Sequence, residues 1–203
     1  MKKLTKIMAV SAVALSTTTY AHNNDLIKDK AQAKQACQIE KVDQVFKLMS
    51  ERATLISEVA ANKYITGGSV YTAPQEDKVL LKSNEIANDL NLNQASLMIF
   101  TQVQMDVSKQ IETYWIKYWK DHPKKAPTKE SIQSLTKIRD QLVKIDTKLY
   151  PAIKKSIHSL KHCNSSEVQN AYNKYFDSIK GIPSSPNYNA MFLQSVKNIK
   201  VNR

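Results

Sequence analysis

Two cations occur on the otherwise apolar face of one predicted helix. The stretch runs Met49-Ser-Glu-Arg-Ala-Thr-Leu-Ile-Ser-Glu-Val-Ala-Ala-Asn-Lys63. At about 100° per residue, Arg52 and Lys63 share a narrow arc with Ile56 and Val59. Such an apolar arc normally faces a protein core, where an unpaired cation is costly. The spacing allows two interpretations. The cations line a pocket for a small polyanion, or they snorkel past the core or pair with acidic residues of a neighbouring helix.

A second predicted helix carries three polar residues in the middle of its apolar face. Gln104, Ser108 and Glu112 follow one another at intervals of four, so helical geometry stacks them. Three polar groups in a row indicate the wall of a polar cavity. Arg139, on or beside the apolar stripe of a later helix, adds another cation. Without an obvious nucleophile, these residues suit a reaction that needs positioning and electrostatic stabilisation.

Other chemistries find little support in the sequence. No glycine-rich phosphate loop, nucleophile elbow or zinc-protease signature occurs. His158 and His162 have a spacing that can bind a metal, but no carboxylate or further histidine completes the set nearby. We therefore expect no metal site. The aromatic cluster in residues 114–119 is interpreted as core and helix-end packing.

The elements that must position these residues are predicted to be helices. The 203-residue chain is 42% hydrophobic, has 3 glycines and shows almost no strand-like alternation, which argues against β-hairpins. We predict one all-α domain of about six helices. They are expected to begin near residue 25 or 28 and end at 64, and then to cover about 74–90, 94–119, 129 onward with a kink near Pro151, 167–179 and 187–199.

The first 21 residues have the pattern of a signal peptide, so residues 22–203 are expected to form the mature domain. Three lysines precede an apolar run from Ile7 to Leu15, and Thr19-Tyr20-Ala21 fits a cleavage site. The apolar run is too short to span a membrane, and no other stretch is long enough. We therefore expect the protein to work in a periplasm or outside the cell.

Charge and cysteine content agree with export. The predicted signal contains three lysines and no acids, so its removal lowers the net charge from +12 to +9. The lysines are spread along the chain, which indicates a solvated surface, and nucleic acid is not an expected partner of an exported protein. In an oxidising compartment Cys37 and Cys163 most simply form one disulfide; free or intermolecular thiols are the alternatives.

Three stretches resemble the all-helical chorismate mutases, specifically their secreted class. The first contains Arg52 and, eleven residues later, the Lys63 of a V-A-x-x-K-[WY] run. The second, from Val70 to Leu80, is similar to P-I-x-D-x-x-R-E-x-x-V-L. The third, from Phe100 to Glu112, is similar to F-F-x-x-Q-I-x-A-[ST/N]-K-x-[IV]-[QE]. A weaker similarity at Leu135-Thr-Lys-Ile-Arg139 extends the match to about half the chain.

The resemblance implies an enzyme that rearranges chorismate to prephenate without a cofactor, and a homodimer. The catalyst must hold a folded dianion and stabilise negative charge on the ether oxygen of the breaking bond. The implied roles are carboxylate binding by Arg52, Arg139 and Ser108, ether-oxygen contact by Lys63 and Glu112, and ring-hydroxyl contact by Glu76. The full set of implied catalytic residues is Arg52, Lys63 and Glu112, and that of substrate-binding residues is Gln75, Glu76, Gln104, Ser108 and Arg139.

Position 75 departs from the family pattern. Gln75 stands where the pattern has Arg, which removes one positive charge from a site for a dianion. Its amide can still donate a hydrogen bond, and Lys78 lies one turn further on. Val79 likewise offers no polar contact. Two hypotheses follow: a weakened mutase, or a non-catalytic protein on the same scaffold that binds another small anion or a protein partner.

Overall fold

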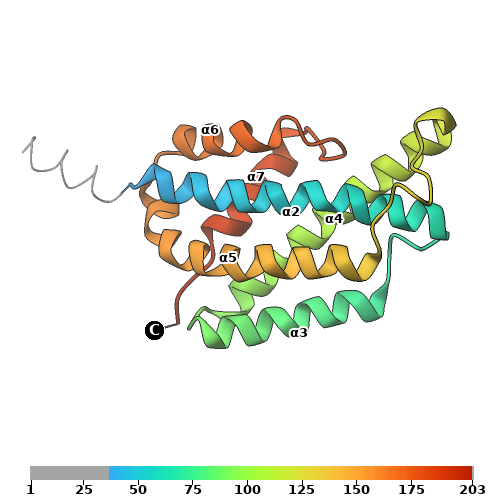
Figure 1. The fold of residues 1–203 in the computed structure, drawn as a ribbon. Helices are drawn as coiled ribbons and strands as arrows, with labels where there is room; N and C mark the ends of the chain where they lie inside the picture. The colour runs from blue at the N-terminus through green and yellow to red at the C-terminus, as the bar shows by residue number, and fades with distance from the viewer. Residues whose placement is uncertain (1–36, 203) are drawn as a thin grey trace, which may run out of the picture. The chain divides into compact units, whose positions relative to one another are not determined.

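The computed structural model describes residues 37–202, which form six α-helices and one short 3-10 helix (Figure 1). The helices are α2 (Ile39–Thr66), α3 (Ala73–Asp89), α4 (Gln94–Asp121), η1 (Pro123–Lys125), α5 (Leu135–His162), α6 (Ser165–Phe176) and α7 (Pro186–Lys197). The predicted all-α class is confirmed. The predicted signal peptide and the first residues of the predicted mature domain lie outside the described residues.

Local sequence signals account for several helix ends. Gly67 adopts a left-handed conformation, φ 72°, and ends α2 with its N–H bonded to the Lys63 carbonyl. Pro74 lies in the first turn of α3, where its missing N–H costs nothing. The Asn93 side chain accepts a hydrogen bond from the Ser96 N–H at 3.0 Å and caps α4. A glycine, a proline and an asparagine thus occupy helix positions that these residue types normally favour.

One predicted helix start was wrong, and one predicted helix is interrupted; the start predicted for that helix lies outside the described residues. The fourth helix begins at Leu135 and not near residue 129, because residues 128–131 form a turn in which the Ser131 hydroxyl bonds both backbone groups of Thr128. Ser134 then caps α5. The first predicted helix is not continuous through residues 37 and 38, since the Gln38 N–H donates to Ser159 Oγ at 3.2 Å instead of entering a helical ladder.

The later helices differ from expectation by smaller amounts. α6 is capped by Asn164, because Asn164 and Glu167 form a reciprocal capping box. The helix ends at Phe176, three residues earlier than expected. Pro151 lies inside α5, and the helix continues through that position.

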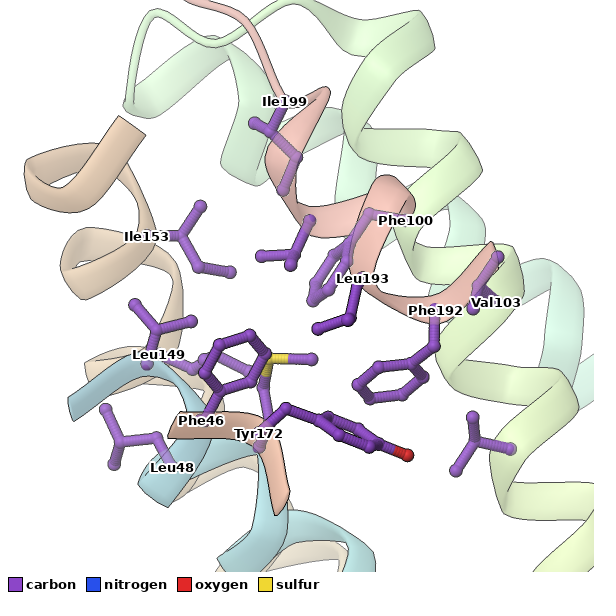
Figure 2. Packing of buried hydrophobic residues seen from close by; sticks show 14 of the residues in the cluster. Phe46, Leu48, Phe100, Val103, Leu149, Ile153, Tyr172, Phe192, Leu193 and Ile199 are labelled. Atoms are coloured by element: carbon purple, nitrogen blue, oxygen red, sulfur yellow. The ribbon is translucent and has the colours of Figure 1, made fainter. Parts of the chain in front are cut away.

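One hydrophobic core joins the helices. α2 packs against α5, α4 and α6, while α3 packs against α4 and α7 against α4 and α5. In Figure 1, α2 runs between α6 and α5, and its direction is opposite to that of α5. Figure 2 shows Phe46, Phe100, Tyr172 and Phe192 pointing toward one another, and the Phe46 and Tyr172 ring centroids are 5.9 Å apart. Within the described part of the chain no helix is long and apolar enough to cross a membrane.

The core fixes how α2 presents its second half. Val42, Val45, Phe46 and Met49 are fully buried, which sets the rotation of α2 about its axis. The residues that continue the same face toward the C-terminus are Arg52, Ile56, Val59 and Lys63. The two cations must therefore point inward, toward α4 and the first turns of α5.

Candidate active site

A cavity of about 130 Å³ opens where α2, α3, α4 and the start of α5 meet. Its lining includes residues 70 and 72 of the segment that connects α2 and α3. The charged or polar lining residues are Arg52, Lys63, Thr72, Gln75, Glu76, Ser108, Lys109, Glu112 and Arg139. The apolar ones are Ile56, Val59, Val70, Val79, Met105, Leu135 and Leu142. Residues far apart in the sequence thus form a cationic pocket with an apolar floor, which suits a small anion with a ring.

Arg52 is held at two of its nitrogens. Nη1 donates to Ser108 Oγ at 3.3 Å, and Nε lies 3.3 Å from Asp146 Oδ1 of α5. Its side chain is only 13% exposed. Ser108 Oγ in turn donates to the Gln104 carbonyl at 2.8 Å, which fixes the hydroxyl that Arg52 contacts. The guanidinium is therefore oriented before any ligand binds.

Lys63 and Glu112 form the most buried ion pair at the cavity. Lys63 Nζ lies 2.6 Å from Glu112 Oε2 and donates a second hydrogen bond to the Val70 carbonyl at 3.2 Å. The two side chains are 13% and 7% exposed. Burial raises the pKa of the Glu112 carboxyl, and the hydrogen bond and charge of Lys63 oppose this shift without cancelling it. The nearby Glu76 adds to the increase.

Three residues complete the wall toward α3 and α5. Gln75 and Glu76 are both partly buried in the first turn of α3, and Glu76 Oε2 lies 3.5 Å from Lys109 Nζ. Arg139 lies in the second turn of α5 and is exposed. Among residues 37–202 its guanidinium makes no ion pair, so it is available to an anionic ligand.

Gln104 is not part of this lining. Its side chain is buried, and its Nε2 atom has no hydrogen-bond partner among the described residues. Of the three polar residues predicted to line a cavity, only Ser108 and Glu112 reach it. Gln104 accepts a hydrogen bond from the Ser108 hydroxyl through its backbone carbonyl. We assign no ligand contact to the Gln104 side chain.

Both interpretations of the two α2 cations hold together. Arg52 and Lys63 pair with acids of neighbouring helices, as the structural interpretation expected, and both also line the cavity. Asp146 was missed, although it lies seven residues after Arg139 and four after Leu142, on the same face of α5. Lys109 was missed as well, although it shares one helical face with Met105, Ser108 and Glu112.

A second, larger cavity of about 470 Å³ adjoins the first. Arg52, Gln75, Val79, Arg139 and Leu142 line both, so the two spaces meet at these side chains. The second cavity extends along α3 and α5, past Lys78, Ile86, Val143 and Tyr150. Lys78, the residue one turn beyond Gln75, therefore faces the second cavity and not the first.

The predicted disulfide is confirmed, and the histidine pair shows no metal geometry. Cys37 and Cys163 are bonded, with an S–S distance of 2.06 Å. His158 and His162 stack, and His162 Nδ1 lies 2.8 Å from the His158 carbonyl. The one cluster of candidate metal ligands in residues 37–202 is Cys37, Cys163 and Glu167, whose two sulfurs are already joined.

Comparison with known proteins agrees with this fold. Residues 37–113 match the family described as chorismate mutase type II. The structure is similar to a secreted chorismate mutase from Yersinia pestis, with a TM-score of 0.63 and 20% identity over 78% of this chain and 98% of that one.

Two chorismate mutases from Burkholderia are similar as well. The one from Burkholderia thailandensis has a TM-score of 0.61 and 18% identity, over 77% of this chain and 94% of that one. The one from Burkholderia phymatum has a TM-score of 0.61 and 15% identity, over 78% and 94%. No curated protein matches the chain at a significant level. The resemblance to the all-helical chorismate mutases, drawn from the residues, is thereby confirmed.

Proposed function

We propose that this protein is a chorismate mutase whose active site is the cavity between α2, α3, α4 and α5. The observation that carries the proposal is the inward-facing pair of Lys63 and Glu112 beside Arg52 and Arg139, on a chain whose residues 37–113 match the family. The proposed reaction is intramolecular: the ether C–O bond breaks while a C–C bond forms within the same molecule. The protein supplies neither a nucleophile nor a cofactor.

The two arginines bind the carboxylates of the substrate. Arg52 is pre-oriented by Ser108 and Asp146, and Arg139, which lines the same cavity, makes no ion pair within residues 37–202. Guanidinium groups bind carboxylates through two parallel hydrogen bonds. Two such groups hold the dianion folded, with its reacting carbons close together. Ser108 supports the carboxylate at Arg52, and Glu76 accepts the hydrogen bond of the ring hydroxyl.

Charge stabilisation falls to Lys63 and Glu112. As the ether bond breaks, negative charge grows on its oxygen, and the Lys63 ammonium provides a point charge there. Glu112 can donate a hydrogen bond to the same oxygen only when it is protonated. Its raised pKa favours that form. A partly apolar cavity strengthens both interactions because it excludes water.

The direct test is loss of chorismate absorbance with the purified mature chain and its Arg52→Ala and Lys63→Ala variants. Lys174→Ala is a matched control, because Lys174 pairs with Asp43 of another helix and lines neither cavity. We expect turnover in the wild type and the control, and its loss in both site variants while circular dichroism stays helical. A folded wild type without turnover would exclude the enzyme.

Gln75 favours a second candidate, a weakened or non-catalytic relative that binds another small anion or a protein partner. Gln75 lines both cavities without a charge. Gln75→Arg separates the two: a gain in turnover of roughly 10- to 150-fold indicates a weakened enzyme. Absence of turnover in both forms would favour the binding protein.

We also propose a periplasmic or secreted location after cleavage near residue 21. The disulfide and the similarity to a secreted relative support this location. The mass of the exported protein is the test, because a retained leader would contradict cleavage. A homodimer remains a proposal from the resemblance, to be tested by light scattering.

A further inference from the structure

We propose that Lys109 is a substrate-binding residue and supplies the cation that is missing at position 75. The inference rests on the proposed function. Lys109 follows Ser108 on α4 and lines the same cavity as Arg52, Lys63 and Arg139. It deepens the proposal by naming a carboxylate-binding group outside the family pattern's arginine position.

The position of Lys109 suits this role. Its side chain is 29% exposed and spans from α4 to α3, where Nζ lies 3.5 Å from Glu76 Oε2. On its own helix Nζ lies 2.9 Å from Asp106 Oδ1. An ammonium has three donors, and the contact to Glu76 is longer than an ordinary hydrogen bond. Lys109 can therefore direct one of its N–H donors toward a ligand and keep its ion pair with Asp106.

The charge of the cavity lining also favours a role for Lys109 in binding a dianion. The lining carries four cations, Arg52, Lys63, Lys109 and Arg139, and two acids, Glu76 and Glu112. With Glu112 ionised, the sum of these charges is +2 with Lys109 and +1 without it, and with Glu112 protonated it is +3 and +2. Asp106, which also pairs with Lys109, is 44% exposed, so solvent screens its charge more than that of Glu76.

Three of the other basic residues are less suited to the position. Arg52 is committed to Ser108 and Asp146, and Lys63 to Glu112 and the Val70 carbonyl. Lys78 is exposed and faces the adjoining cavity. Lys109 approaches the α3 wall that carries Gln75, since it contacts Glu76, the next residue in the chain.

A purely structural role for Lys109, as a tie between α3 and α4, makes a different prediction. In a purely structural role, Lys109 acts through its contact with Glu76 and the position of α3. A new positive charge at position 75 would not restore activity that is lost with this contact. A substrate cation can be replaced by another cation that faces the same cavity. Rescue by Gln75→Arg therefore distinguishes the two roles.

The experiment measures kcat and KM for chorismate with Lys109→Met, Gln75→Arg and the double variant. Lys174→Met is the control, since Lys174 also pairs with an acid of another helix but lines neither cavity. We expect Lys109→Met to lower kcat/KM roughly 10- to 100-fold, mainly through KM. In the Gln75→Arg background, Lys109→Met should lower kcat/KM by less than about 3-fold. Lys109→Arg should keep most of the activity.

Each result decides the proposal. Two results overturn the inference while the wild type still turns over chorismate, which leaves the proposed function intact. In the first, Lys109→Met lowers kcat/KM no more than Lys174→Met does. In the second, Lys109→Met lowers kcat/KM equally with Gln75 and with Arg at position 75. If the wild type binds chorismate in calorimetry without turnover, the proposed function fails, and the same variants decide the inference through Kd. If the wild type neither binds nor converts chorismate, both fail.

Discussion

Lys63 of α2 and Glu112 of α4 meet at 2.6 Å in the wall of the cavity, so a ligand oxygen that contacts both must lie beside the pair. In this structure the acid and the base satisfy each other. A ligand that takes the Lys63 hydrogen bond leaves Glu112 buried with less compensation, and a carboxylate in that position becomes easier to protonate. Ligand binding and protonation of Glu112 are therefore coupled.

This coupling predicts the pH dependence of activity. The pKa of Glu112 is raised, so its protonated form persists to higher pH than for an ordinary glutamate and disappears as pH rises through that pKa. We expect kcat/KM to be highest at mildly acidic pH and to fall as pH increases. Glu112→Gln, which always carries a donor, should flatten the profile. Initial rates from pH 4.5 to 9 provide the measurement, and a wild-type rate that climbs steadily toward alkaline pH would contradict it.

Asp146 should make stability depend on pH in an unusual direction. Burial raises the pKa of its carboxyl, with the charge of Arg52 opposing the shift incompletely. The folded state therefore holds this proton at pH values where the unfolded chain has released it. By linkage, the stability due to Asp146 is present below its unfolded pKa and is lost as pH rises through the higher folded pKa.

Asp146→Asn tests this sign because asparagine does not ionise. The free energy of unfolding of the variant relative to wild type should increase from pH 4 to pH 7 in urea titrations. Asp140→Asn, at an exposed position on the same helix, is the control for the substitution itself. A relative stability of Asp146→Asn that instead decreases with pH would mean that Arg52 stabilises the charged aspartate by more than burial costs it.

Helix periodicity predicted the main features of the site but not their partners. The face that holds Arg52 and Lys63 follows from residue spacing alone, because the buried residues before them fix the rotation of α2. Asp146 was not singled out, although its spacing from Arg139 and Leu142 places it on their face of α5. The start of α5 was predicted about two helical turns too early, because periodicity did not reveal the hydrogen-bonded turn at Thr128. The sequence also says nothing of which backbone carbonyl Lys63 reaches, since Val70 lies in an irregular link.

Gln104 shows the limit of the spacing argument. It shares a helical stripe with Ser108 and Glu112, yet only those two reach the cavity. Residues spaced by four lie at 400° and not at 360°, so a stripe of three drifts by about 80° around the helix axis from its first to its last member. The disulfide was easier to predict, because two cysteines in an exported chain leave one intramolecular pairing.

Gly181 is predicted to be required for packing between the α6–α7 loop and α4. Its φ is 91°, and an added Cβ would lie 2.7 Å from Tyr114 Cβ and 2.8 Å from Ile111 Cα. The backbone of α4 cannot move aside cheaply, so Gly181→Ala should lower the free energy of unfolding by about 2–4 kcal/mol. Gly67→Ala is the control: φ is 72° there, nothing lies within 4 Å, and we expect about 1 kcal/mol. Equal losses in urea denaturation would refute the packing argument.

The disulfide should affect stability far more than activity. Cys37 lies just before α2 and Cys163 just after α5, so the bond joins the two antiparallel helices at the end opposite to Lys63 and Arg139. It closes a loop with a sequence separation of 126, and the chain-entropy model assigns such a loop about 3–5 kcal/mol. At the other end, α2 is held to α4 and α5 by the buried core and by the two ion pairs of Arg52 and Lys63.

We therefore expect the double variant Cys37→Ser, Cys163→Ser to unfold at a clearly lower urea concentration and to keep its kcat/KM within about 3-fold at 25 °C, where it remains folded. Thiol reduction of the wild type should reproduce the stability loss, which controls for the serine side chains. A folded double variant with strongly reduced turnover would mean that strain at the disulfide end reaches the cavity along α2 or α5. The core that separates the bond from the cavity would then be less rigid than its burial indicates.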